Sequence, residues 1–158
     1  MEREAREIMK PKASIHDTEC QFIKELRKRV YLQFINKPEL NMKENILVDL
    51  SKKLAVEIVN VCTRIRESGK STILLNQVLR SGTSIGANIH EAKYASSRSD
   101  FINKLQIALK ECYETEYWIE LFKDTHIVTE EEYKDLFARC NKVRKLLIAS
   151  ITTAKENA

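Results

Sequence analysis

Apolar residues recur at steps of three and four along four long stretches of the chain, and this spacing constrains the fold more than any other feature. The stretches run from about residue 45 to 68, from 71 to 95, from 99 to 123 and from 129 onward. Such steps place side chains on one face of an α-helix. Each stretch is therefore predicted to be an amphipathic helix that buries one apolar stripe.

The residues of these stripes are the candidate core. The first contains Leu47, Leu50, Leu54, Ile58, Val61 and Ile65, and the second Leu75, Val78, Gly82, Ile85, Ile89 and Ala92. The third contains Ile102, Leu105, Leu109, Cys112 and Ile119, and the fourth Tyr133, Phe137, Cys140, Val143, Leu147 and Ile151.

Helix ends are also marked in the sequence. Gly69 is expected to stop the first helix, because glycine enters the left-handed region without steric cost. Ser71 is the expected N-cap of the second helix. Thr129 and Glu132 have the spacing of a capping box, in which each side chain satisfies a free backbone donor.

Four amphipathic helices joined by short loops bury their stripes best as an antiparallel up-down-up-down four-helix bundle. The chain has only 3 glycines and 2 prolines, while 32% of its residues are charged. That is too little turn chemistry for a β-sandwich or an α/β protein. We therefore predict an all-α protein with one bundle domain at residues 42–158.

Residues 1–41 form a different segment, an N-terminal extension that holds both prolines. Its stretch TECQFIKELRKRVYLQF predicts one extra helix with an apolar face, beside the basic run from Arg27 to Arg29. The segment is interpreted as a docked helix, a partner-binding arm or a poorly ordered leader. Met42 is a candidate start of the compact domain.

Several classes of protein are disfavoured. The mean hydropathy of −0.39 and the lack of a long apolar run argue against a membrane span, and the N-terminus lacks the apolar core of a signal peptide, so a cytoplasmic location is expected. The histidines and cysteines have no metal-ligand spacing, and the cysteines read as buried thiols. The stretch ESGKST resembles the end of a P-loop, but Arg64 stands where the first glycine belongs. We expect no metal, no cofactor and no enzymatic activity.

The second predicted helix contains RSGTSIGANIHEA, in which small and polar residues replace good helix formers. We interpret this stretch as a seam where another helix or subunit packs closely, and the alternative is that the serines face water. Two charged residues near apolar stripes, Glu116 and Arg144, are expected to join the buried polar contacts. Glu116 is predicted to meet Arg144, Arg80 or Asn88, or else to reach water at the bundle edge. The complete seam set is Gln77, Arg80, Ser81, Gly82, Ser84, Gly86, Asn88, Glu91, Glu116 and Arg144.

Two outer surfaces are candidate contacts. Trp118, Leu121 and Phe122 are predicted to project away from the third stripe, toward a second subunit or the N-terminal helix. The second surface, Lys134, Arg139, Lys142 and Lys145, is a candidate nucleic-acid contact on the fourth helix. Acids such as Asp135 make an ordinary solvated face the alternative.

The stretches LLNQVLRSGTSIGANIHEA and SRSDFINKLQIALKECYETEYWIELF resemble the bacterial family of 23S rRNA intervening-sequence proteins. The resemblance spans about residues 42–154 and rests on Arg80, Ser81, Ser84, Ile85, Asn88, Ile89, Glu91, Asp100, Phe101 and Ala108. The chain departs from the pattern at Ala92, where the family commonly has glycine, and by its extension at residues 1–41.

The resemblance implies an antiparallel four-helix bundle that forms a homopentamer. It also implies a similarity to the accessory variability protein of diversity-generating retroelements, which binds nucleic acid together with a reverse transcriptase. We therefore expect a self-associating, non-enzymatic protein that binds RNA or DNA through basic helix surfaces. A protein–protein scaffold without nucleic-acid affinity is the alternative.

Overall fold

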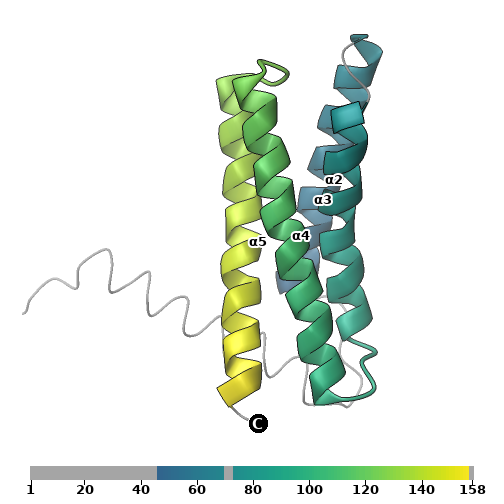
Figure 1. Ribbon diagram of the computed structural model, residues 1–158, viewed down its shortest axis with the longest axis vertical. Coiled ribbons are helices and arrows are strands. Elements are labelled where there is room, and N and C mark those ends of the chain that lie inside the picture. Colours follow the sequence, from purple (N-terminus) through teal and green to yellow (C-terminus); the bar gives the residue numbers. More distant parts are fainter. Residues whose placement is uncertain (1–45, 70–72, 157–158) are drawn as a thin grey trace, which may run out of the picture.

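The computed structural model describes residues 46–69 and 73–156, and within these residues the chain forms four helices and no strand (Figure 1). The helices are α2 (Ile46–Glu67), α3 (Ile73–Ala92), α4 (Arg98–Asp124) and α5 (Glu130–Glu156). The all-α prediction is confirmed for this part of the chain. The predicted N-terminal helix, the candidate start at Met42 and the Ser71 N-cap lie outside the described residues.

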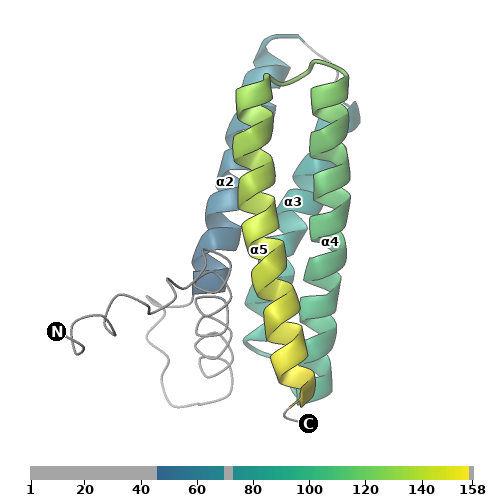
Figure 2. The same ribbon diagram turned by 90° about the vertical axis from the view of Figure 1, so that its left-hand side faces the viewer.

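The four helices form one bundle. α3 packs against α2 and α4, and α5 packs against α4 and α2. The connections alternate between the two ends of the bundle, so consecutive helices run antiparallel (Figure 2). The helices α2 and α4 therefore occupy diagonal corners.

The helix ends follow local hydrogen-bond chemistry. Gly69, two residues after the end of α2, adopts a positive φ of 77°, as a helix-stopping glycine does. Ser97 is the N-cap of α4, and its hydroxyl accepts a bond from the Asp100 amide at 3.1 Å. At the start of α5 the Thr129 amide donates to Glu132 at 2.8 Å, while the Glu132 amide donates to the Thr129 hydroxyl at 3.2 Å. The predicted capping box is confirmed.

The predicted stripes match the core closely on α2 and α3 and less closely on the two longer helices. Every position of the second stripe is buried, and in the first only Leu50 is half-buried. On α4 the buried face is turned by about one residue, because Phe101 and Ala108 are buried while Ile102 and Leu109 are half-buried. On α5 the stripe members Tyr133 and Phe137 are half-buried. The buried residues that the α5 stripe missed are Leu136, Leu146, Ala149, Ser150 and Ala154.

The prediction that Phe122 projects outward from the third helix is wrong, because its side chain is only 1% exposed. It follows Ile119 by three positions and so shares the buried face. The loop after α4 also folds back over this end of the helix, because the Ile127 amide donates to the Phe122 carbonyl at 2.8 Å. Val128, in the same loop, is buried with it.

No helix among the described residues combines the length and the apolar character that crossing a bilayer requires.

Candidate functional site: helix seams and exposed faces

Two polar residues of the predicted seam on α3, Ser81 and Glu91, contact α4. Ser81 is fully buried, and its hydroxyl oxygen lies 2.9 Å from the hydroxyl of Thr115 on α4. Lys104 of α4 donates to Glu91 of α3 at 2.5 Å. Asn88 is half-buried and donates within its own helix, to the Ser84 carbonyl at 2.9 Å. Ser81 and Glu91 therefore contact α4 directly, while Asn88 bonds within α3.

The glycines of α3 face a different neighbour, α2. A Cβ atom at Gly82 would lie 2.4 Å from Cδ1 of Ile58, well inside contact distance. At Gly86 the nearest atom to such a Cβ is the hydroxyl oxygen of Ser51, at 3.7 Å. Gly82 therefore sets how closely α2 approaches, and Gly86 does not.

Arg80 holds a small charged cluster on the outer side of the α3/α4 seam. Its guanidinium pairs with Glu114 and lies 3.9 Å from Glu111. The indole of Trp118 also donates to Glu114, at 3.2 Å. Burial, followed by the charge of Glu114, raises the pKa of the Glu111 carboxyl. Gln77, also in the predicted seam set, is half-buried.

Glu116 pairs with Arg144, one of its three predicted partners. Nε of Arg144 donates to the Glu116 carboxylate at 2.7 Å and links α4 to α5. The Glu116 side chain is 12% exposed and that of Arg144 is 25% exposed. The same guanidinium donates to Asn141 at 2.9 Å and lies 5.5 Å from the ring centroid of Tyr113. The hydrogen bond to Glu116 raises the pKa of Arg144.

The exposed aromatic residues of α4 differ from those predicted. Trp118 and Leu121 are half-buried, and Trp118 packs against the core. The exposed side chains are Tyr113 and Tyr117, at 51% and 57%. They lie outside the apolar stripe of the sequence, although their spacing of four residues already places them on one outer face.

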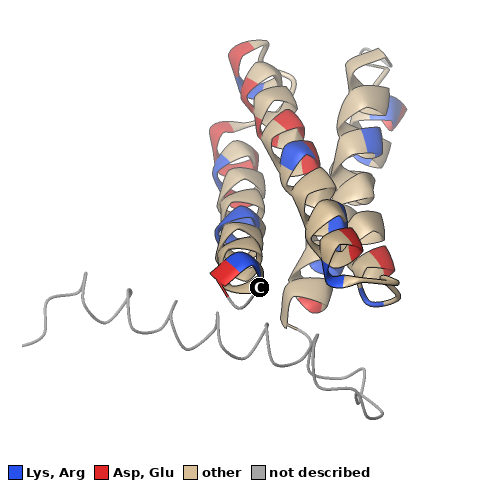
Figure 3. Cartoon of the chain, turned by 60° about the horizontal axis from the view of Figure 1, so that its bottom comes forward, with Lys and Arg blue, Asp and Glu red and all other residues tan. Residues whose placement is uncertain are grey.

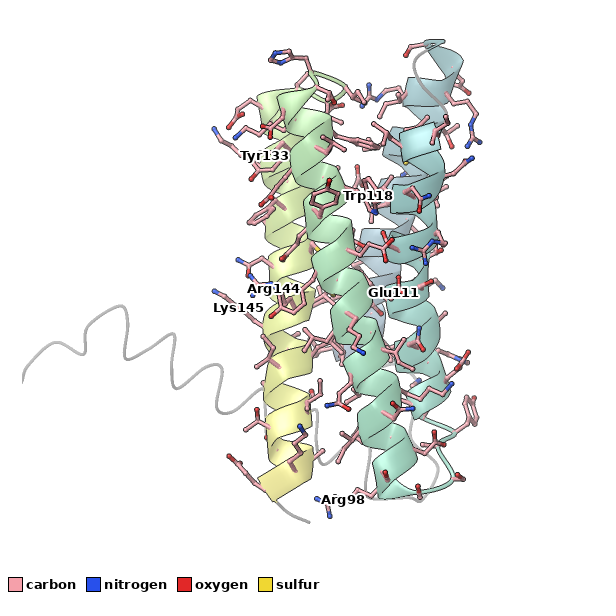
Figure 4. All side chains as sticks on the ribbon, viewed as in Figure 1. Arg98, Glu111, Trp118, Tyr133, Arg144 and Lys145 are labelled. Atoms are coloured by element: carbon pink, nitrogen blue, oxygen red, sulfur yellow. The ribbon has the colours of Figure 1, made fainter. Side chains whose placement is uncertain are left out.

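Basic and acidic residues are interspersed along the helices (Figure 3). The four candidate nucleic-acid contacts of α5 fall into two pairs with different surroundings. Lys134 lies 3.4 Å from Glu130, and Arg139 lies 2.7 Å from Asp135, each partner one turn earlier on the same helix. Lys142 and Lys145 are exposed, and Lys145 points away from the bundle (Figure 4). Glu130 and Asp135 thus compensate the positive charges of Lys134 and Arg139.

Three cysteines, Cys62, Cys112 and Cys140, are buried free thiols. Burial raises the pKa of Cys62 to about 11. The pKa of Cys112 is also raised, through its hydrogen bond with Cys140 and through burial. Within the residues that the structure describes, histidine, cysteine and acidic side chains form no group of three that could hold a metal ion.

Comparison with known proteins identifies the family. The model of the 23S rRNA-intervening sequence protein family matches residues 43–149. The chain belongs to this family. The chain is also similar to a protein of unknown function from Bacteroides thetaiotaomicron, which has a crystal structure and is assigned to the S23 ribosomal protein family. The two are 49% identical with a TM-score of 0.66, over 67% of this chain and 98% of the other. No curated protein matches the chain.

Proposed function

We propose that this intervening-sequence protein is a non-enzymatic helical bundle whose first activity is self-association. The observation that carries the proposal is the exposure of Tyr113 and Tyr117 on one face of α4. Large exposed aromatic side chains gathered on one face are typical of contact surfaces. The family resemblance gives the expected assembly, a homopentamer. The buried free thiols of the described residues favour a reducing compartment, so the proposal places the protein in the cytoplasm.

Self-association is tested by the mass of the full-length chain in solution. Light scattering after size-exclusion chromatography is expected to give a mass several times that of one chain, which is 18.4 kDa. A mass of one chain at every concentration tested would contradict the proposal.

Nucleic-acid binding is the second part of the proposal, and it rests on Lys142 and Lys145. Both are exposed, and they lie three positions apart on α5, so their ammonium groups can reach the same backbone of an RNA or DNA strand. In an assembly this pair would be repeated on every subunit. A scaffold that binds only proteins is the alternative, with a reverse transcriptase as the candidate partner that the family resemblance suggests.

Salt-titrated binding to structured RNA and to duplex DNA separates the two alternatives. Each phosphate contact contributes roughly 0.9 to the slope of log affinity against log salt on duplex DNA. The variant K142A/K145A is expected to reduce that slope by up to about 2 per engaged subunit.

The matched control is K134A/R139A, which removes two cations of the same helix that Glu130 and Asp135 already compensate. The control is expected to change the salt slope less than K142A/K145A does. Equal effects of the two variants would remove the assignment to Lys142 and Lys145, and no binding at low salt would favour the scaffold.

A further inference from the structure

Two of the described cysteines meet inside the bundle, although 28 positions separate them in the sequence. Cys112 lies on α4 and Cys140 on α5, and both side chains are fully buried. The Cys140 thiol donates to the main-chain carbonyl of Cys112 at 3.6 Å. The two thiols are also hydrogen-bond neighbours of each other. The packing of α4 against α5 therefore places one thiol beside the other.

A further described cysteine shows that burial alone does not produce such a pair. Cys62 lies on α2 and is 1% exposed. The influences on its pKa are burial and the charge of Arg66, and neither of the other two buried thiols is among them. The described part of the chain therefore offers a paired site and a single buried thiol that serves as its comparison.

We propose that Cys112 and Cys140 form a modification site, at which a small disulfide such as oxidised glutathione links α4 to α5 through a disulfide bond inside the bundle. The proposal depends neither on self-association nor on nucleic-acid binding. In a reducing compartment both groups stay thiols, and the link forms when the ratio of oxidised to reduced glutathione rises.

The spacing of packed helices permits this link. A disulfide usually joins residues whose Cα atoms are about 4.4–6.8 Å apart. Helix axes about 8–10 Å apart, with a Cα radius of about 2.3 Å, leave roughly 3–5 Å between Cα atoms that face each other directly, and more between offset positions. Cys112 and Cys140 lie on facing sides of α4 and α5. Rotation of two short side chains, without displacement of either helix, can therefore join the sulfur atoms.

The chemistry is thiol–disulfide exchange in two steps. One cysteine thiolate attacks a sulfur atom of oxidised glutathione, which forms a mixed disulfide and releases one glutathione thiolate. The second cysteine thiolate then attacks the protein sulfur of the mixed disulfide and displaces the other glutathione. The protons lost by Cys112 and Cys140 are taken up by the two glutathione thiolates. Two protein thiols are oxidised to one disulfide, and one oxidised glutathione is reduced to two thiols.

The link has a consequence for the stability of the bundle. It closes the chain between α4 and α5 and so restricts the unfolded chain more than the folded one. It also joins the two helices beside an ion pair that already connects them, since Glu116 and Arg144 follow Cys112 and Cys140 by four positions. Oxidation is therefore expected to stabilise the bundle reversibly.

The experiment measures the equilibrium between the dithiol and the disulfide in buffers of known reduced and oxidised glutathione. Every protein is full-length and carries Cys20→Ser, so that the cysteine of the N-terminal extension cannot exchange. Equilibrium is approached from reduced and from oxidised protein. After acid quenching, intact mass distinguishes a link, which removes two hydrogen atoms, from a glutathione adduct, and peptide mapping locates both.

The effective concentration of the pair is expected to be at least about tenfold higher in native buffer than in concentrated urea, because a link that stabilises the fold is favoured by the fold to the same extent. The linked protein is expected to melt several degrees above the reduced one, and dithiothreitol is expected to abolish the difference. Cys62→Ser should link like the parent. Cys140→Ser should form glutathione adducts and no link within the chain.

An effective concentration no higher in native buffer than in urea would overturn the proposal, because the folded bundle would then strain or separate the pair. A link within Cys140→Ser, or a link to Cys62 in the parent under native conditions, would overturn it as well. Circular dichroism checks the fold of each variant. If Cys140→Ser loses helix content, Cys140→Ala replaces it with the same expected result.

Discussion

Gly82 sets the distance between α2 and α3 at the level of a single atom. The Cβ that alanine would add there meets Cδ1 of Ile58 at 2.4 Å and Cγ2 at 3.3 Å. Ile58 is 1% exposed, so its side chain has to move within a packed core. Overpacking of this kind costs about 1–3 kcal/mol, while alanine regains about 1 kcal/mol of helix propensity.

Gly82→Ala is therefore expected to lower the free energy of unfolding by about 1 kcal/mol. Gly86→Ala is the matched control, because its Cβ meets only ordinary contacts, and it is expected to stabilise by up to about 1 kcal/mol. Urea denaturation measures both. Adding Ile58→Val to Gly82→Ala should recover part of the loss by removing the Cδ1 clash, and a double variant with purely additive losses would contradict this explanation.

The folded state disfavours the ionised form of the Glu111 carboxyl. Its Oε2 atom is buried and has no hydrogen-bond partner among the described residues, although Arg80 lies 3.9 Å away. Burial raises its pKa in the folded state. The destabilisation therefore begins as the pH rises above the unfolded pKa and is complete above the folded pKa.

Glu111→Gln is expected to raise the free energy of unfolding at pH 7 and to change it little at a pH below both pKa values. Urea midpoints at the two pH values provide the measurement. Glu114→Gln should instead lose up to about 1 kcal/mol at pH 7, because Glu114 accepts from Arg80 and Trp118 at a partly exposed site. If both substitutions changed the free energy of unfolding at pH 7 in the same direction, the different roles of Glu111 and Glu114 would be contradicted.

At the scale of elements, the beginning of α5 shows how local chemistry fixes a helix boundary. Glu132 accepts from the Thr129 amide and pairs with Arg64 of α2, so one side chain caps α5 and joins it to a neighbour. Burial by itself raises the pKa of this carboxyl, but the hydrogen bonds with Thr129 and the pairing with Arg64 outweigh it, and the net pKa is lowered. Its stabilisation is present above the unfolded pKa and is lost as the pH falls through the folded value.

Glu132→Gln can still accept from the Thr129 amide but loses the charge that pairs with Arg64, so it is expected to cost up to about 1 kcal/mol at pH 7. The difference from wild type should shrink as the medium becomes acidic. Denaturation across an acid pH series tests this. The neighbouring Glu131, exposed on the same turn, supplies the control substitution Glu131→Gln. A constant difference between Glu132→Gln and wild type at every pH would show that the cap does not depend on the carboxylate charge.

The sequence predicts the existence and the capping of helices better than it predicts which face of a long helix is buried. Thr129 and Glu132 mark the start of α5 directly, because both partners of the cap are local. On α4, apolar residues occur on both sides of the true stripe, so a stripe begun at Ile102 rather than Phe101 is displaced around the helix. Packing against α3 and α5 decides between them, and that is not local information.

At the scale of the whole molecule, the bundle and its outer faces differ in how far the sequence predicts them. Apolar periodicity and the scarcity of turn residues are enough for four helices. The pairing of Glu116 with Arg144 was one of several alternatives, since only the register of α4 against α5 selects it. The exposed tyrosines, Tyr113 and Tyr117, lie outside the stripes, so apolar spacing alone does not find them.

A chain of residues 42–158 is expected to fold without the N-terminal extension. The family model begins at residue 43, and a relative with a solved structure is aligned over 98% of its own length with 67% of this chain. Circular dichroism should show helical content and one cooperative thermal transition. A fragment that is helical only with residues 1–41 attached would show that the extension is part of the folding unit.

The burial of Cys62, Cys112 and Cys140 has a practical consequence for following motion in this bundle. Only a thiolate reacts quickly with an alkylating reagent, and the raised pKa values of Cys62 and Cys112 keep both groups protonated at neutral pH. Labelling therefore has to wait until the surrounding helix separates from its neighbours. Cys62, Cys112 and Cys140 lie on α2, α4 and α5. Their modification rates can therefore time the opening of each of these helices without any engineered probe.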